Sequence, residues 1–155
     1  YYANEERDDG IASTKFRRAP PMHAATPLVA PGATTITTRK LVELFKGARP
    51  AQTNELDWRE GAFAIPGSVW IHGMGKERLS AAEFSELKTL LEKVAPDKAA
   101  PLVLYCLSWE CWLSYNAILS VAELGYKNIY WYRGGINAWN QARLPIVRTR
   151  LLKQF

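Results

Sequence analysis

The stretch that decides the fold runs from residue 102 to residue 117 and reads Leu102-Val-Leu-Tyr-Cys106-Leu-Ser-Trp-Glu-Cys111-Trp112-Leu-Ser-Tyr-Asn-Ala117. Its first four residues are apolar or aromatic and predict a short buried strand. From Trp112 to Gly125 the pattern is typical of a helix. The six residues between, 106–111, hold both cysteines of the chain. A strand that passes through a tight loop into a helix directs backbone N–H groups at one point, and a thiol at such a point is activated as a thiolate. Cys106 is therefore the candidate reactive residue.

Segments before and after this stretch predict strands and helices in alternation. Ser80-Ala-Ala-Glu83 is a capping box, and the apolar residues after it recur at helical spacing until Pro96. Residues 128–132 predict a strand, which Arg133-Gly134-Gly135 connects to a last helix over residues 136–143. Alternating strands and helices connect through right-handed crossovers into a parallel sheet. The sequence therefore predicts an α/β fold, a single domain with a central, mostly parallel sheet and helices on both faces.

Weaker elements precede the capping box. We expect a helix over residues 39–46, capped by Thr37 or Thr38, with Gly47 in the left-handed conformation that often follows a helix. Further on, we expect a polar strand within residues 51–60 and a short apolar strand over residues 69–71. The loop that follows, residues 72–76, contains two glycines, which indicate unusual backbone angles or a close approach of other segments.

Composition divides the chain into three parts. Residues 1–35 contain several prolines and little periodicity, which indicates an irregular N-terminal arm along the domain. Residues 36–147 form the domain, and residues 148–155 form a basic C-terminal tail. A chain of 155 residues suits one domain with a sizeable core.

Charge and composition narrow the classes of function. The net charge is +5, and the segment from Arg143 to Phe155 has four basic and no acidic residues. Because no basic helix interleaved with aromatic residues is present, a solvated tail is favoured over a nucleic-acid surface. No apolar run approaches the roughly 20 residues that a membrane span needs. The N-terminus is acidic and polar, unlike a signal peptide, although cleavage of a signal would leave the same trace.

The cysteines and histidines do not form a metal site. Two cysteines are too few for a disulfide scaffold or a four-ligand metal site, and His23 and His72 lack ligand spacing with them. We therefore expect no metal and no cofactor. His72 has a second, weaker interpretation as a general base, if its glycine-containing loop folds over Cys106.

The order of motifs over residues 55–147 resembles that of rhodanese-like domains. Asp57-Trp-Arg59-Glu60 resembles an Asp-x-Arg run of that family, and Ile65-Pro-Gly-Ser-Val69 resembles its turn into a strand. Leu102-Val-Leu-Tyr-Cys106 resembles the strand that delivers the catalytic cysteine, and Gly134-Gly-Ile-Asn-Ala-Trp139 with Leu144-Pro-Ile-Val147 resembles the closing helix. The resemblance implies a sulfurtransferase in which Cys106 attacks sulfane sulfur and carries it as a persulfide. Its partners would be a sulfane-sulfur donor and a thiol acceptor.

A narrower resemblance is to periplasmic rhodanese-like proteins associated with quinoprotein (pyrroloquinoline quinone-dependent) alcohol oxidation, which have a Cys-x-x-Cys-Trp motif. It is carried by Cys111-Trp112, Leu113-Ser-Tyr-Asn-Ala117 and Pro66-Gly-Ser-Val-Trp70. In this chain four residues, not two, separate the cysteines. The resemblance implies a periplasmic location and a quinoprotein dehydrogenase or its cytochrome as partner.

The loop residues constrain the chemistry of the candidate site. Glu110 is the only charged residue in the loop, and a carboxylate there repels thiosulfate and raises the pKa of a neighbouring thiol. Trp109 and Trp112 suit an apolar partner better than a dianion, and Trp112 stands where the phosphatase variant of this loop needs arginine. Arg133 follows a strand at its C-terminal end, so it either supplies the missing positive charge or is solvated. The full set of candidate loop and substrate-binding residues is Leu107, Ser108, Trp109, Glu110, Cys111, Trp112 and Arg133.

Three hypotheses of function follow from this loop. The first is the sulfurtransferase with a persulfide on Cys106. In the second, Cys106 and Cys111 form a thiol–disulfide pair, because the ends of such a loop lie close enough for a disulfide or for Cys111 to act as a resolving thiol. A small buried residue is an equally good interpretation of Cys111. The third is a non-catalytic binding module that serves a quinoprotein dehydrogenase.

Overall fold

The computed structural model describes residues 4–47, 51–54 and 63–155. In these residues, a central sheet has the strand order β1-β6-β5-β2-β4-β8, and all of its neighbouring strands pair in parallel. Two further strands, β3 (Phe63–Ala64) and β7 (Val147–Arg148), form a small antiparallel sheet. The strands of the central sheet are β1 (Ala33–Ile36), β2 (Ala51–Asn54), β4 (Ser68–His72), β5 (Leu102–Tyr105), β6 (Ile129–Tyr132) and β8 (Leu151–Gln154). The helices are α1 (Thr38–Lys46), α2 (Ala81–Val94), α3 (Trp112–Glu123) and α4 (Gly135–Gln141).

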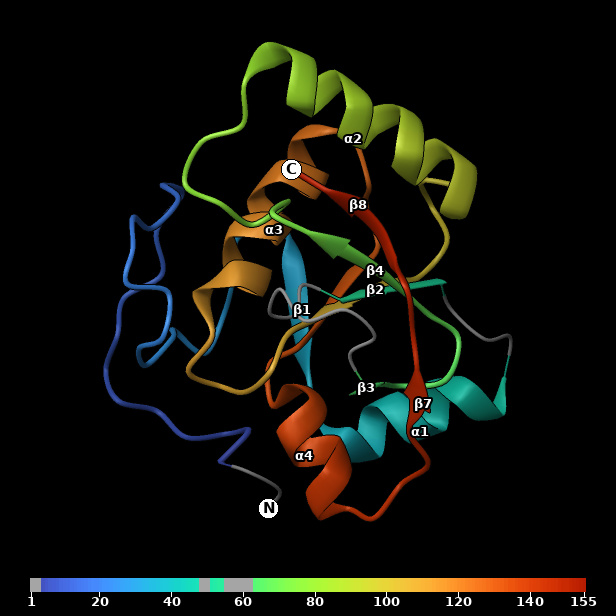
Figure 1. Cartoon of the computed structure of the whole chain (residues 1–155). Helices are drawn as coiled ribbons and strands as arrows, with labels where there is room; N and C mark the ends of the chain where they lie inside the picture. Colours follow the sequence, from blue (N-terminus) through green and yellow to red (C-terminus); the bar gives the residue numbers. More distant parts are fainter. Residues whose placement is uncertain (1–3, 48–50, 55–62) are drawn as a thin grey trace.

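Helices cover both faces of the central sheet. Figure 1 shows α2 and α3 in the upper half of the molecule and α1 and α4 in the lower half, with the sheet between them. Strand β5 is buried along its whole length, and its side chains alternate between two apolar clusters. Leu102 and Leu104 pack with α2 and α3, whereas Val103 and Tyr105 pack with α1 and α4. The predicted α/β class is thus confirmed.

The helix ends follow the local signals in most cases. Ser80 and Glu83 form the predicted capping box of α2, and the Thr37 side chain caps α1 by accepting from the Lys40 N–H. Gly125, with φ of +93°, follows the end of α3 in the left-handed conformation. The prediction for Gly47 is wrong, because its φ is −96° and its N–H closes α1 by donating to the Leu44 carbonyl.

The C-terminal segment, expected as a solvated tail, instead adds strand β8 to the sheet. The strand lies beside β4, and the Phe155 N–H donates to the carbonyl of His72 at 2.8 Å. Phe155 packs against the α2–α3 cluster and attaches a segment whose other side chains stay largely exposed. Gly73, with φ of +88°, allows this approach, because a β-carbon there would lie 2.6 Å from the Phe155 carbonyl oxygen. The run from Asp57 to Glu60 lies outside the described residues.

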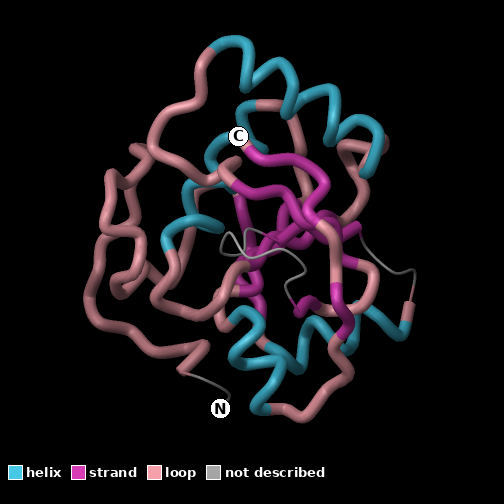
Figure 2. Tube along the Cα trace, viewed as in Figure 1, coloured by secondary structure: helices cyan, strands magenta, loops and turns pink. Residues whose placement is uncertain are grey.

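The N-terminal arm, here residues 4–32, packs as an irregular segment against α3. Figure 2 shows it as loop along one side of the molecule. The Asn116 side chain accepts from the Arg18 N–H and donates to the Arg18 carbonyl, both at 2.9 Å. The Tyr115 hydroxyl makes the corresponding pair with the backbone of Thr14, at 2.8 and 2.7 Å. These side chains belong to the motif at residues 113–117, so part of that motif holds the arm. Within the described residues, no helix has the length and apolar character for crossing a membrane.

Candidate cysteine site

The cysteine loop, residues 106–111, connects the C-terminal end of β5 to the first turn of α3. Strand β5 lies inside the sheet between β6 and β2, so the loop emerges among the carboxyl-terminal ends of the inner strands. Ligands of open parallel sheets bind beyond these strand ends. Cys106 directly follows the strand, and Cys111 is the N-cap residue of α3. The sequence predicts these same positions for the two cysteines, after a strand and before a helix.

Cys106 and Cys111 are joined by a disulfide, and their Cα atoms are 6.3 Å apart. The two ends of the loop are therefore as close as disulfide formation requires. Only 3% of Cys106 and 8% of Cys111 is exposed. In this oxidised state Cys106 is not a free thiolate at the surface, as the sulfurtransferase hypothesis requires, so reduction must precede any attack by its sulfur.

Helix α4 fixes the first half of the loop. The N–H groups of Ile136 and Asn137 donate to the carbonyls of Cys106 and Leu107, at 3.0 and 2.9 Å. Gly135 has φ of +62°, and a β-carbon there would collide with the Cys106 carbonyl oxygen. The loop carbonyls therefore point toward α4, which leaves the N–H groups of residues 107–109 without a hydrogen bond to any described residue.

The second half of the loop uses its N–H groups internally or on the arm. Ser108 accepts from the N–H of Glu110 through its side chain, at 3.2 Å, and from the N–H of Cys111 through its carbonyl, at 3.1 Å. The Trp112 N–H, at the start of α3, donates to the carbonyl of Met22 at 2.9 Å. Only part of the expected ring of N–H donors is thus available to an anion at Cys106.

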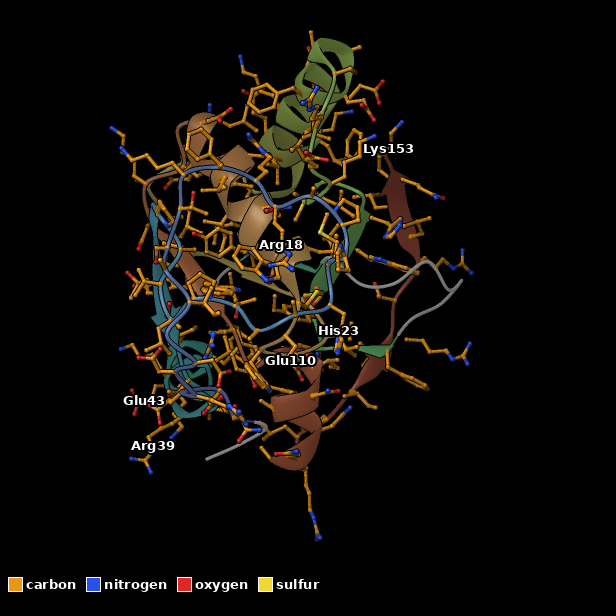
Figure 3. The ribbon with its side chains drawn as sticks, turned by 90° about the vertical axis from the view of Figure 1, so that its left-hand side faces the viewer. Arg18, His23, Arg39, Glu43, Glu110 and Lys153 are labelled. Atoms are coloured by element: carbon orange, nitrogen blue, oxygen red, sulfur yellow. A yellow bond between two sulfur atoms is a disulfide. The ribbon has the colours of Figure 1, made fainter. Side chains whose placement is uncertain are left out.

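The arm lies directly over the loop. His23 and Cys111 form an isolated antiparallel bridge, and the Ala24 N–H donates to the Glu110 carbonyl at 2.8 Å. The Thr26 hydroxyl donates to the Trp109 carbonyl at 2.5 Å. In Figure 3 the arm crosses in front of α3, and His23 lies beside Glu110; their side chains are 3.9 Å apart. Residues 22–26 therefore add an extended segment to the cysteine loop.

Arg133 anchors the arm to the domain. Its side chain is 1% exposed, which excludes the solvated alternative. Its guanidinium donates to the hydroxyl and carbonyl of Thr26, at 2.9 and 2.8 Å, and to the carbonyl of Glu5, at 3.1 Å. Burial lowers the pKa of Arg133, while the charges of Asp9 and Asp8 act in the opposite direction. Each of these hydrogen bonds is directed at the arm rather than at an open anion site.

The two loop tryptophans are covered by arginines of the arm. Arg7 of the arm and Arg133 of the domain both lie over Trp109, with guanidinium carbons 5.1 and 5.6 Å from the centre of its ring. Trp112 lies under Arg18, at 5.0 Å. Both rings are therefore buried where the arm packs on the loop and the start of α3.

Exposure separates the remaining loop residues. Ser108 is 6% exposed, and its hydrogen bonds stay within the loop. Leu107 is 45% exposed, and Glu110 is half-buried. Leu107 and Glu110 are thus the loop side chains that an approaching molecule meets. The sequence missed Thr26 and Met22 as neighbours of the site, because nothing in their local pattern indicates a contact with a loop more than 80 residues away.

Comparison with known proteins identifies the family. The family model of the rhodanese-like domain matches residues 48–142, more than half of the chain. The chain therefore belongs to the rhodanese-like domain family, as the order of its motifs predicted. None of the curated proteins matches it significantly.

Solved structures share the fold at low sequence identity. A full-length protein from Lactobacillus plantarum is 16% identical with a TM-score of 0.55, over 74% of this chain and 87% of that one. The polysulfide-sulfur transferase of Wolinella succinogenes is 16% identical with a TM-score of 0.52, over 75% of this chain and 79% of that one. The thiosulfate sulfurtransferase of Pseudomonas aeruginosa is 17% identical with a TM-score of 0.52, over 78% of this chain but only 21% of that one. Structural neighbours of this domain thus include sulfurtransferases.

Proposed function

We propose that this protein is a sulfurtransferase that carries sulfane sulfur as a persulfide on Cys106. The observation that carries the proposal is the position of Cys106, which directly follows β5 and precedes three N–H groups, those of residues 107–109, that have no partner among the described residues. N–H groups aimed at a developing anion stabilise it by about 3 kcal/mol each when well aligned. Reduction of the disulfide gives Cys106 the thiolate that this chemistry needs.

The charge around the loop favours a sulfane donor other than thiosulfate. Glu110 is partly exposed at the loop, and the guanidinium of Arg133 is engaged by the arm. Of the described arginines near the loop, Arg7 is paired with Asp9, Arg18 donates to the Pro21 carbonyl and Arg133 donates to the arm. A dianion therefore meets a carboxylate there and no uncommitted arginine, so a persulfide of lower charge is the better donor. Leu107, which is exposed beside Cys106, suits an apolar portion of such a donor.

The physiological setting that we propose is periplasmic, in quinoprotein alcohol oxidation. It is supported by Cys111-Trp112 and the motif at residues 113–117, which resemble those of rhodanese-like proteins of that system. A quinoprotein dehydrogenase or its cytochrome is the proposed partner. A periplasmic setting is also compatible with a disulfide, because that compartment is oxidising.

The test of persulfide formation uses the Cys111→Ser variant, in which Cys106 is free of its disulfide partner. After incubation with a small-molecule persulfide or inorganic polysulfide, intact mass and peptide mapping should show an addition of about 32 Da on Cys106, the mass of one sulfur atom. The Cys106→Ser variant is the control and should gain no mass. If Cys111→Ser, folded by circular dichroism, gains no sulfur from either donor, the sulfurtransferase proposal is wrong.

The disulfide itself favours a second candidate, a thiol–disulfide protein that exchanges electrons through Cys106 and Cys111. Equilibration of the wild-type protein with buffers of reduced and oxidised dithiol should then convert both thiols together in a two-electron step. Thiols that both stay free in the most oxidising buffer would exclude this candidate. A protein that fails both tests would be a binding module, and retained capture of a quinoprotein dehydrogenase by Cys106→Ala would support that role.

A further inference from the structure

We infer that Cys111 expels the sulfane sulfur from Cys106 as hydrosulfide, which makes the protein a sulfane-sulfur reductase that depends on a dithiol partner. This inference rests on the proposed persulfide on Cys106 and specifies where its sulfur goes. It differs from transfer to a second thiol substrate, in which the sulfur stays at the sulfane level. Three features of the site support it: access, electrostatics and the position of Cys111.

Access to Cys106 favours a thiol that is already in the site. Cys106 is 3% exposed, α4 holds its carbonyl on one side, and the arm is bound to residues 109–112 of the same loop. An external acceptor thiol must pass this cover to reach a persulfide. The sulfur of Cys111 needs no approach, because the loop already holds it within bonding distance of Cys106.

The electrostatics of the loop stabilise a persulfide anion only in part. The N–H groups of Glu110, Cys111 and Trp112 are engaged by Ser108 and by Met22 of the arm. The carboxylate of Glu110 belongs to the same loop, and the hydrogen bonds of the Arg133 side chain are directed at the arm. Among the N–H groups of the loop, only those of residues 107–109 are left to stabilise a persulfide anion, and the carboxylate of Glu110 opposes them, which favours resolution of the persulfide over long storage.

Cys111 occupies the position of an attacking thiolate. It is the N-cap of α3, a helix of twelve residues, and no side chain caps that helix end. The positive end of the helix dipole therefore lies at Cys111 and favours negative charge there. The N–H of Cys111 donates to the Ser108 carbonyl and its backbone bridges to His23, so contacts other than the disulfide hold the backbone of Cys111 beside Cys106.

The resolving step balances as follows. The thiolate of Cys111 attacks the inner sulfur of the Cys106 persulfide, and a bond forms between the two cysteine sulfurs. The bond from Cys106 to the outer sulfur breaks, and that sulfur leaves with the electron pair and takes up a proton as hydrosulfide. The sulfane sulfur is reduced and the two cysteines are oxidised to the disulfide seen in the structure. A dithiol reductant then returns two electrons and two protons and is itself oxidised to a disulfide.

The experiment measures hydrosulfide and thiols in a single turnover. Wild-type protein is reduced, freed of reductant under anaerobic conditions and mixed with one equivalent of inorganic polysulfide or a small-molecule persulfide. Loading from the small-molecule persulfide releases its thiolate, and loading from polysulfide releases a polysulfide one sulfur shorter, an amount that Cys111→Ser measures by itself. Beyond that amount we expect about one equivalent of hydrosulfide per chain and the loss of both protein thiols, before any dithiol is added. Cys111→Ser should instead keep an added sulfur on Cys106 and release at most a tenth as much hydrosulfide until a dithiol is supplied. Cys111→Ala should behave in the same way, which guards against an effect of the serine on folding.

The outcomes separate this inference from the proposed function. If wild-type protein holds a stable persulfide with the Cys111 thiol still free, the reductase inference is overturned while the sulfurtransferase proposal stands. Uptake of sulfur by neither Cys111 variant contradicts the proposed function itself. Donor consumption by Cys106→Ser equal to that of wild type would also overturn the inference, because it would show reaction without the persulfide.

Discussion

Arg133 shows how one side chain affects the chemistry open to the cysteine loop. A buried guanidinium beside a reactive sulfur normally attracts an anionic substrate. In this protein the same group donates to Thr26 and Glu5 of the arm and stacks on Trp109 of the loop. Its charge still contributes a positive potential, but its directed hydrogen bonds hold the cover of the site. The selectivity against thiosulfate that we propose is a consequence of this geometry.

Tyr132 provides the first prediction at the residue scale. Its ring is fully buried at the end of β6, and its hydroxyl lies 2.6 Å from the hydroxyl of Thr38. Burial raises the pKa of Tyr132, and the negative charges of Glu5 and Tyr105 raise it further, against the opposing hydrogen bond of Thr38. An unfolded tyrosine loses its proton near pH ~10, so stability is retained below that pH and falls as the pH rises above it, by at most about 1.4 kcal/mol per pH unit.

Replacing Tyr132 by Phe removes this contribution to the pH dependence. At pH 8 the variant should lose about 1 kcal/mol of unfolding free energy with the Thr38 hydrogen bond, and between pH 10 and 11 its stability should fall less steeply than that of wild type. Urea unfolding of the oxidised proteins at each pH measures both effects. Tyr115 and Tyr126, whose pKa values burial also raises, leave a residual slope in the variant. Parallel curves for the two proteins would contradict the assignment.

At the scale of elements, the sequence predicted what local signals encode. The capping box of α2, the buried strand β5 and the strand–loop–helix around Cys106 all follow from residues next to one another in the chain. The contact of the arm with the loop was not predictable in this way. It depends on backbone groups of residues 22–26, which carry no sequence pattern, and on Arg133, whose partners are about a hundred residues distant. The cover over Trp109 and Trp112 was not predictable for the same reason, since it comes largely from the arm.

The junction of α4 with the cysteine loop gives the second prediction. Gly135 has φ of +62° and abuts the carbonyl of Cys106, whereas Gly10 has φ of +73° and a β-carbon added to it would meet no atom within 4 Å. Gly135→Ala should therefore destabilise the protein by about 3 kcal/mol or more, because strain and a backbone collision add. Gly10→Ala is the matched control, with strain alone and an expected loss of about 1 kcal/mol. Urea unfolding measures both variants, and equal losses would show that the loop does not depend on close contact with α4.

At the scale of the whole molecule, the sheet has two edges with different surroundings. The β1 edge is next to the arm, since the Thr35 hydroxyl donates to the carbonyl of Leu28. The other edge is β8, which the sequence did not reveal because three basic residues and no acidic one lie in residues 148–155, as in a solvated tail. The strand forms because β4 pairs with it in parallel and the α2–α3 cluster offers an apolar surface for Phe155. These partners exist only once the domain has folded.

The last prediction tests whether β8 belongs to the folded domain. Deleting residues 150–155 removes the pairing of β8 with β4 and the packing of Phe155, and it makes β4 an edge strand beside the fully buried Trp70 and Ile71. We expect a loss of about 3 kcal/mol or more in unfolding free energy, from several backbone hydrogen bonds and a partly buried aromatic ring.

Lys153→Gln is the control for charge. It removes the exposed ion pair with Glu86, 2.7 Å long, and the contact of the ammonium with the Phe155 ring, but it keeps the strand pairing and the packing of Phe155, and should cost less than about 1 kcal/mol. Urea unfolding and binding of a hydrophobic dye measure both variants. If the deletion costs as little unfolding free energy as the lysine substitution, residues 150–155 are a solvated tail. The expected larger loss would show that β8 is a stabilising strand of the sheet and supports the loop of residues 72–76.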